Sequence, residues 1–278
     1  MRVVHAFPRA RRRAPTIIAL HSSAASGRQW QALAARLDSR AQVIGPDLAG
    51  HGTGRGWRDD AASIVETDVA RVAQLAAGTP GGVHLVGHSY GGAIAMRVAL
   101  AFPGRVRSLA VYEPVLFRLL GDVYGRRGPS AGVLDVAGAI RRDMRAGLVE
   151  RAAARFVDFW SGAGTWASMP RERRVAVTLR MPAVAAQFPA LWHDPVGLAD
   201  YRALDLPVLL MCGASSPIAP RRIVELLSTA MPQAELQPMS AMAHLGPITH
   251  PNTVAQRIDA FLSSVEAIEV DAALGVAA

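Results

Sequence analysis

The heptapeptide VGHSYGG, residues 86–92, is the stretch from which the fold can be inferred. It begins at the end of an apolar run that predicts a buried strand, and it leads into the small-residue-rich segment Tyr90–Ala101, which predicts a helix. At such a sharp turn Gly87 and Gly91 leave room for the neighbouring chain, and the serine between them is exposed for attack. We therefore predict that Ser89 is a nucleophile, which needs a base, an acid and an oxyanion site.

Short aliphatic or β-branched runs alternate with helical patterns along the chain. The strand candidates are residues 16–20, 42–45, 83–86, 108–112, 208–212 and 234–237. This alternation predicts the α/β class, with a mostly parallel, doubly wound sheet of six to seven strands. Residues 115–199 contain helical windows but no convincing strand, so we predict an all-helical cap over the strand ends, where open sheets bind ligands. The predicted core then comprises residues 1–114 and 200–278.

Composition limits the classes of partner. The chain has 278 residues, 51% of them hydrophobic, and a formal charge of +8 without any lysine. The arginines are scattered, so we expect solvated faces and no nucleic-acid partner, although a positive field attracts acidic substrates. The single cysteine, Cys212, excludes an internal disulfide and lies in an apolar run, which predicts a buried thiol and a reducing, cytoplasmic location. No apolar run is long enough for a membrane span.

Two further segments extend the likeness of the serine turn to a known family. ALHSS at residues 19–23 follows an early predicted strand, and GPDLAGHG at residues 45–52 follows the next one. With the serine turn, they resemble the α/β-hydrolase family, and the likeness runs over nearly the whole chain. The resemblance implies a cofactor-free serine hydrolase whose oxyanion is bound by the backbone N–H groups of Tyr90 and Ser23. Ser22 stands where the family usually has glycine; if that position needs a positive φ, serine costs about 1 kcal/mol or more.

The family order of nucleophile, acid and base directs the search for a base to the last third of the chain. His244 lies in MAHLGP, residues 242–247, after the last predicted strand and before the last predicted helix. His250 begins that helix, so we assign it a capping or packing role. The histidines and acidic residues do not show metal-ligand spacing, and we expect no metal site. The predicted base is therefore His244.

The position of the acid departs from the common family pattern. The turn where family members commonly carry aspartate reads GASSPIAP, residues 213–220, and contains no carboxylate. Glu113 ends the predicted strand that follows the nucleophile helix, and some α/β-hydrolases carry their acid at this strand end. Because an unpaired buried carboxylate is costly, Glu113 either orients the base or pairs with an arginine at the cap hinge. We predict that Glu113 completes a triad with Ser89 and His244.

The cap sequence is rich in aromatic and thioether side chains, and most of them are expected to pack the cap onto the core. A minority are expected to line an apolar pocket for a hydrophobic substrate. The pocket candidates from the whole chain are His21, Ser22, His88, Phe117, Trp160 and Leu245. Cap arginines such as Arg118 and Arg180 are either solvated or bind a substrate carboxylate.

The predicted function is hydrolysis of a small to medium-sized hydrophobic carboxylic ester through an acyl-enzyme intermediate. An enzymatic alternative keeps the same triad in a C–C bond hydrolase or a cofactor-free haloperoxidase-like perhydrolase. A third hypothesis is a hydrolase-like binding protein without turnover, which is favoured by the missing aspartate and the missing glycine. The intact serine turn and His244 weigh against it.

Overall fold

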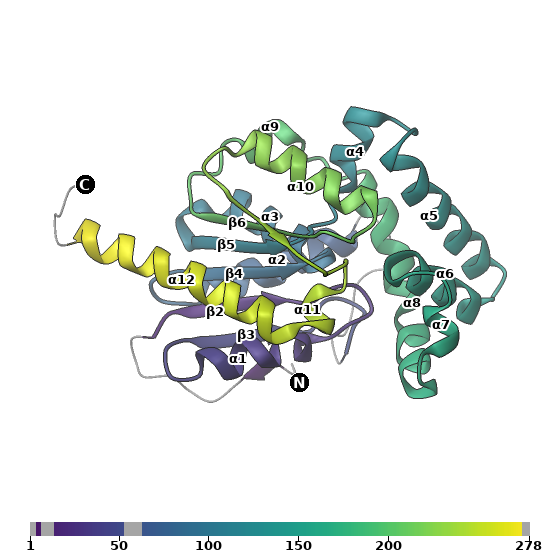
Figure 1. The fold of residues 1–278 in the computed structure, drawn as a ribbon, viewed down its shortest axis with the longest axis horizontal. Helices are drawn as coiled ribbons and strands as arrows, with labels where there is room; N and C mark the ends of the chain where they lie inside the picture. Colours follow the sequence, from purple (N-terminus) through teal and green to yellow (C-terminus); the bar gives the residue numbers. More distant parts are fainter. Residues whose placement is uncertain (1–3, 7–13, 53–62, 274–278) are drawn as a thin grey trace.

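A seven-stranded sheet forms the centre of the computed structural model, which describes residues 4–6, 14–52 and 63–273 (Figure 1). The strand order is β1-β3-β2-β4-β5-β6-β7. Only β1 pairs antiparallel, with β3, and the other described pairs are parallel. The bounds are β1 (Val4–Ala6), β2 (Thr16–Leu20), β3 (Gln42–Pro46), β4 (Val83–His88), β5 (Val106–Tyr112), β6 (Val208–Gly213) and β7 (Glu235–Met239). The predicted α/β class and mostly parallel sheet are confirmed.

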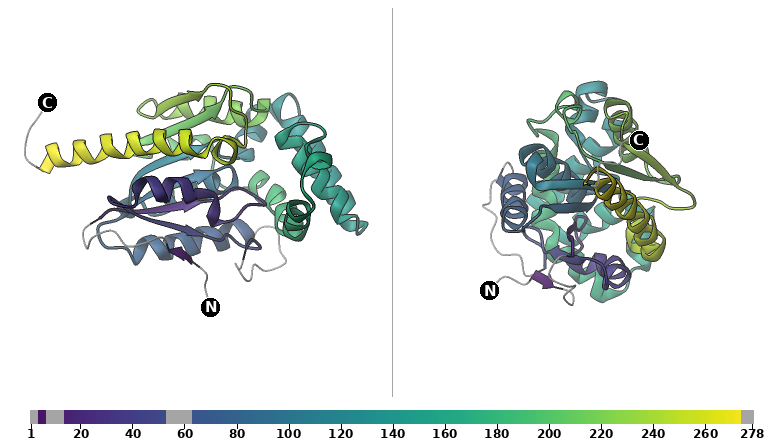
Figure 2. Two further views of the ribbon diagram at one scale, coloured as in Figure 1. Left: turned by 60° about the horizontal axis from the view of Figure 1, so that its bottom comes forward. Right: turned by 90° about the vertical axis from the view of Figure 1, so that its left-hand side faces the viewer.

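Helices cover both faces of this sheet (Figure 2). They are α1 (Gln31–Leu37) and α12 (Pro251–Ala273) on one face, and α2 (Ser63–Ala77), α3 (Tyr90–Ala101) and α10 (Ile218–Ala230) on the other. Successive side chains of a strand point to opposite faces. In β2, accordingly, Ile17 and Ala19 pack with the α1 and α12 side chains, whereas Ile18 and Leu20 pack with those of α2 and α3. The sheet is thus buried on both sides.

Short helical segments complete the core. They are the 3-10 helices η1 (Gly27–Trp30) and η2 (Pro103–Arg105), the single turn α9 (Leu198–Tyr201), which packs near α10, and α11 (Gly246–Thr249), which precedes α12. None of the helices in the described part of the chain is both long and apolar enough to span a bilayer.

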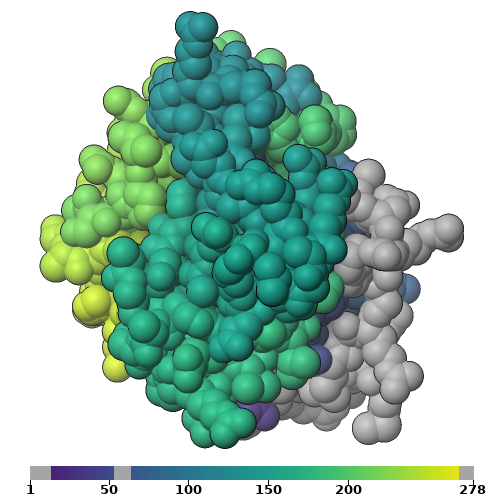
Figure 3. Space-filling view, turned by 90° about the vertical axis from the view of Figure 1, so that its right-hand side faces the viewer, coloured from purple at the N-terminus to yellow at the C-terminus, as the bar shows by residue number. Residues whose placement is uncertain are grey.

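The segment between β5 and β6 is helical throughout its regular structure, and most of it lies beyond one end of the sheet (Figure 1). The helices at that end, called the cap below, are α4 (Phe117–Tyr124), α5 (Pro129–Arg145), α6 (Val149–Ser161), α7 (Thr165–Ser168) and α8 (Arg171–Trp192). Figure 3 shows that they form the surface over this end. The boundaries 115 and 199 of a separate cap domain stay a prediction.

Candidate active site

Ser89 lies at the turn between β4 and α3, with φ 55° and ψ −117°. This is a conformation that L residues rarely adopt. A Cβ atom at Gly91 would lie 2.4 Å from the carbonyl oxygen of Leu20, and one at Gly87 would lie 2.6 Å from the carbonyl oxygen of Gly91. The predicted steric need for glycine on both sides of the serine is therefore confirmed.

The three predicted triad residues lie in one hydrogen-bonded chain. His244 Nδ1 is 2.7 Å from Glu113 Oε2, and His244 Nε2 is 3.0 Å from Ser89 Oγ. The carboxylate accepts the Nδ1–H, so Nε2 carries a lone pair that accepts the serine hydroxyl. All three side chains are buried. The tertiary structure thus brings together a hydroxyl, an imidazole and a carboxylate that are far apart in sequence.

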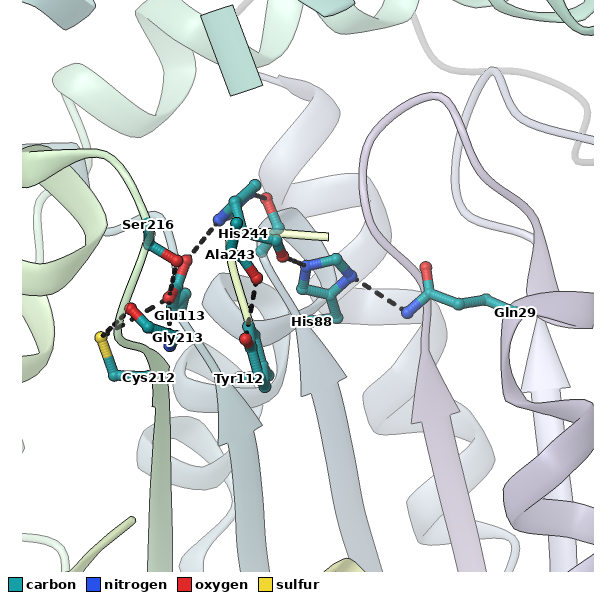
Figure 4. A network of polar contacts seen from close by, with 10 residues as sticks. Gln29, His88, Tyr112, Glu113, Cys212, Gly213, Ser216, Ala243 and His244 are labelled. Atoms are coloured by element: carbon teal, nitrogen blue, oxygen red, sulfur yellow. Dashed lines mark hydrogen bonds and ion pairs between the residues drawn. The ribbon is translucent and has the colours of Figure 1, made fainter. Parts of the chain in front are cut away.

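The loop that carries His244 is anchored to the sheet below it (Figure 4). The Tyr112 hydroxyl donates a hydrogen bond to the carbonyl of Ala243 at 2.8 Å, and His88 Nε2–H donates to the carbonyl of His244 at 2.7 Å. Gln29 Nε2 in turn donates to His88 Nδ1 at 3.1 Å. Burial, followed by the charge of His244, lowers the pKa of His88 well below its usual value. His88 is therefore a neutral support for the backbone of the histidine loop.

Glu113 is held on the oxygen that does not face His244 (Figure 4). Oε1 accepts hydrogen bonds from the backbone N–H of Gly213 at 2.7 Å and from the Ser216 hydroxyl at 2.5 Å, and the Cys212 thiol lies 3.5 Å away. Among the described residues no arginine pairs with it, so the ion-pair alternative for Glu113 has no support in this geometry. Cys212 itself is partly exposed, and the prediction of a buried thiol was wrong.

The loop after β2 is fixed by side chains from several elements. The N–H and hydroxyl of Ser22 both donate to Gln29 Oε1 at 3.0 Å, and the N–H of Ala24 donates to His51 Nε2 at 2.9 Å. The Ser23 hydroxyl donates to Oε1 of Gln187, from α8, at 2.5 Å. The positive φ of this loop falls on Ala24, at 60°, and not on Ser22. The backbone cost considered for a serine at position 22 is therefore not incurred.

The two N–H groups predicted to bind an oxyanion belong to Ser23 and Tyr90. Tyr90 begins α3, and the first N–H groups of a helix have no acceptor within that helix. The helix terminus also carries partial positive charge. The Tyr90 side chain is buried on the far side of the turn, where its hydroxyl donates to Asp68 Oδ2 at 2.9 Å. Only the backbone of Tyr90 is thus available for such a role.

A cavity of about 210 Å³ opens beside Ser89 and His244. Its wall is mostly apolar and comes from the cap, the loop after β2 and the segment that follows His244. The lining residues are Ser22, Ser23, Ala24, Ala25, Phe156, Val157, Trp160, Ser161, Met169, Arg173, Ala176, Val177, Arg180, Leu245 and Ile248. The Trp160 ring stacks on the His244 imidazole, with 4.2 Å between the ring centroids. A second hollow, of about 10 Å³, shares Ser23, Ser89, Phe156 and Trp160 with the first.

The predicted pocket residues divide into two groups. Ser22, Trp160 and Leu245 line the larger cavity, and Phe117 lines the smaller hollow. His21 and His88 line neither, because both rings are fully buried and are used for internal hydrogen bonds. His21 Nδ1–H donates to the carbonyl of Ser22 and Nε2 accepts from the N–H of Leu48.

Two residues that touch the site are absent from the predictions. Ser216 occupies the turn that lacks a carboxylate, and its hydroxyl contacts the acid instead. Gln187 belongs to α8, which the sequence pattern does not predict, because Pro182 and Pro189 lie inside it. The GASS turn was a usable signal for Ser216, since a hydroxyl there faces the acid. No local signal identifies Gln187.

The fold and this geometry agree with the results of comparison. A model of the alpha/beta hydrolase fold family matches residues 15–251, and the chain belongs to this family. A pimeloyl-[acyl-carrier protein] methyl ester esterase of Serratia marcescens is 26% identical over 260 residues, covering 89% of this chain and 94% of that protein. An uncharacterized protein of Mycobacterium tuberculosis is 26% identical over 300 residues, covering 98% and 83%.

Solved structures match over most of the chain. An enol-lactonase from Burkholderia xenovorans has a TM-score of 0.71 at 18% identity and covers 94% of this chain and 96% of its own. A thermophilic esterase from Thermogutta terrifontis has a TM-score of 0.68 at 22% identity and covers 95% and 93%. At these identities the likeness to the solved structures shows a shared fold and no more.

Proposed function

We propose that the protein is a serine hydrolase that cleaves small to medium-sized hydrophobic carboxylic esters through an acyl-enzyme intermediate. The observation that carries the proposal is the hydrogen-bonded chain Glu113–His244–Ser89, which ends beside a mostly apolar cavity. A base that contacts a nucleophile, and an acid that orients the base, form the arrangement required for acyl transfer.

In the first half-reaction, Ser89 Oγ attacks the ester carbonyl while His244 Nε2 takes the hydroxyl proton. Glu113 holds the tautomer with hydrogen on Nδ1 and stabilises the imidazolium that forms. The N–H groups of Tyr90 and Ser23 donate to the oxyanion of the tetrahedral intermediate. Collapse of this intermediate breaks the bond to the alcohol oxygen, which receives the proton from His244.

In the second half-reaction, a water molecule gives a proton to His244 and attacks the acyl-enzyme. The second tetrahedral intermediate expels Ser89 Oγ, which recovers its proton, and the carboxylic acid product leaves. The apolar cavity wall suits an acyl group without many polar substituents. Its cap residues also limit access of bulk water to the base.

The names of similar proteins favour ester cleavage over C–C bond cleavage or perhydrolysis. The Serratia relative is a methyl ester esterase, and the structural neighbours include an esterase and a lactonase, which all act on carboxylic ester bonds. A panel of p-nitrophenyl esters separates the enzymatic alternatives, because a C–C hydrolase turns such esters over poorly. Labelling by a fluorophosphonate separates an enzyme from a binding protein.

Replacement of the nucleophile tests the proposal directly. Ser89→Ala is expected to abolish both the burst of p-nitrophenol and the fluorophosphonate label, because no other hydroxyl contacts His244 Nε2 in the described part of the chain. Ser168→Ala, an exposed serine at the end of α7, is the matched control and keeps both. A burst that survives in Ser89→Ala contradicts the assignment.

A further inference from the structure

Helix α8 presents one row of residues to the active-site cavity. Arg173, Val177 and Arg180 line the larger cavity, and Val184 and Gln187 line the smaller hollow beside Ser89. Their spacing of three or four residues places them on one face of the helix. This face is therefore cationic at one end and carries an amide at the other, next to the nucleophile.

Arg180 has no anionic partner that compensates for its partial burial. Its Nη1 donates only to backbone carbonyls, those of Ala24 at 3.3 Å and Ala176 at 3.0 Å, and it forms no ion pair with a described residue. Arg173, one of the other lining residues, has no ion-pair partner in the described ranges either. Burial lowers the pKa of Arg180, and the charge of Asp47 only partly opposes this effect. Nε–H and the Nη2 hydrogens remain available as donors.

Several cap arginines outside the cavity wall have carboxylate partners. Arg118 binds Asp122, and Arg151 and Arg155 share the carboxylate of Asp143. Arg180 is thus a partly buried cation in a mostly apolar cavity that also contains Ser89. Such a cation is stabilised most when a bound ligand supplies a carboxylate that pairs with it.

We infer that Arg180, assisted by Arg173, binds a carboxylate at the far end of the acyl chain, so that the preferred substrates are half-esters of dicarboxylic acids. The inference rests on the proposed esterase function and specifies its substrate class. The apolar stretch of α8 around Val177 contacts the methylene chain between the ester and the carboxylate. The net charge of +8 favours the approach of such an anion.

Two matched esters test the inference. The value of kcat/KM is measured for p-nitrophenyl hydrogen adipate and for p-nitrophenyl hexanoate, which have acyl chains of equal length but differ in the terminal carboxylate. The wild-type protein is expected to prefer the adipate. Arg180→Met keeps an unbranched side chain and is expected to lower the adipate-to-hexanoate ratio by about 10- to 100-fold, the size of a lost hydrogen bond to a charged group. Arg171→Met, on the same helix but outside the cavity wall, is the control and keeps the ratio.

A binding measurement keeps the two hypotheses separate. Calorimetric titration of Ser89→Ala with adipate is expected to show binding that Arg180→Met, added to Ser89→Ala, weakens by a similar factor. If neither ester is hydrolysed but adipate binding still depends on Arg180, the esterase proposal fails and the anion site stands. An adipate-to-hexanoate ratio that is the same in wild type and Arg180→Met, with no adipate binding, overturns the inference.

Gln187 of α8 is a buried amide side chain, only 2% exposed. Its Oε1 accepts the Ser23 hydroxyl, whereas Nε2 has no partner among the described residues although it is buried. It lines the small hollow together with Ser23 and Ser89. A buried donor without an acceptor costs about 1–3 kcal/mol, so the fold retains it at a cost in stability.

The geometry points to Gln187 Nε2 as a donor to the acyl oxygen or to the alcohol oxygen of the ester at the reaction centre. The same side chain orients Ser23, whose N–H is proposed to bind the oxyanion. Gln187 then contributes one direct contact and holds the loop that contributes a second. The contact strengthens when negative charge develops on the oxygen.

Gln187→Met removes the donor and keeps the length of the side chain. It is expected to lower kcat by about 10²- to 10³-fold with little change in KM. It is also expected to weaken the binding of an alkyl boronic acid, which forms a tetrahedral adduct with Ser89. Binding of the matching neutral ketone, measured in Ser89→Ala, is expected to change little. An unchanged kcat overturns the assignment. Equal losses of affinity for the boronic acid and the ketone also overturn it, because a purely structural role of Gln187 does not favour the tetrahedral ligand over the planar one.

Discussion

At the residue scale, three site residues hold backbone conformations that are rare for L residues. Ser89, Glu113 and Ala24 have φ values of 55°, 46° and 60°. Each such conformation costs on the order of 1–3 kcal/mol and persists when its surroundings over-determine it. Ser89 and Glu113 each follow the end of a strand, where the strained turn redirects the side chain toward His244.

The acid is tested by an isosteric change. Glu113→Gln keeps the shape of the side chain but places an amide against His244 Nδ1, which favours the wrong tautomer. We expect kcat to fall by about 10³- to 10⁴-fold, as for a triad acid that orients the base. Glu235→Gln, at an exposed site on β7, is the control. A mild effect at Glu113, measured with the same p-nitrophenyl ester, would remove it from the triad.

The hydroxyl of Ser216 is tested in the same assay. Ser216→Ala deletes its 2.5 Å hydrogen bond to Glu113 Oε1 and leaves the Gly213 N–H as the remaining short contact. We expect kcat/KM to fall by about 10- to 100-fold, because a hydrogen bond to a charged group contributes about 1.5–3 kcal/mol. The exposed neighbour Ser215→Ala is expected to behave as wild type. Equal rates for both variants would show that Ser216 does not position the acid.

At the scale of elements, the cap contacts the reaction centre through α6 and α8. Trp160 of α6 stacks on His244, and Phe117 of α4 stacks on Trp160 with ring centroids 6.4 Å apart. From α8, Gln187 contacts Ser23 and Arg180 contacts Ala24. The base and the proposed oxyanion loop are therefore both held by the cap as well as by the core.

The stacked tryptophan is the most direct of these links. Trp160→Leu removes the aromatic face over His244 and one wall of the cavity. Because such ring pairs contribute about 0.5–1.5 kcal/mol, we expect a several-fold to about 10-fold lower kcat/KM for p-nitrophenyl esters. Trp166→Leu removes another buried cap tryptophan that does not contact His244, and it should alter stability more than kcat/KM. The reverse order of effects would contradict this prediction.

At the scale of the whole molecule, buried histidines make the fold sensitive to acid. Burial, aided by the charge of His21, lowers the pKa of His51 to about 3, and burial together with Arg107 lowers that of His84 to about 4. In the unfolded chain these rings titrate near 6.5. Below that pH the unfolded state binds protons that the folded state does not, so stability is lost as the pH falls from about 6.5 toward 4.

Thermal unfolding between about pH 7 and pH 4 checks this expectation, and Tm should fall over the range. Asp68 opposes the trend, because burial raises its pKa to about 6 and the folded state gains a proton between about pH 6 and 4. Asp68→Asn removes this opposing group, so its Tm should fall more steeply than that of wild type. A Tm that rises on acidification, or equal slopes for the two proteins, would contradict the expected direction of the pH dependence.

Local patterns in the sequence were sufficient for the parallel strands and the serine turn, whereas the resemblance to the α/β-hydrolase family directed the choice of His244 and Glu113 as candidates. Strand and helix periodicity depends on neighbours in the chain, and so does the close approach of Gly87 to Gly91. They therefore predicted six of the seven strands, which are all the parallel ones.

Only the tertiary structure decided what surrounds these residues. The Ser216 contact with Glu113, the positive φ at Ala24 and the path of α8 through two prolines all depend on contacts between segments far apart in sequence. No local pattern predicts helix α8, because two prolines lie inside it. The helix forms because packing against the rest of the cap offsets the cost of these prolines. The cavity lined by Arg180 and the smaller hollow lined by Gln187 follow from that packing.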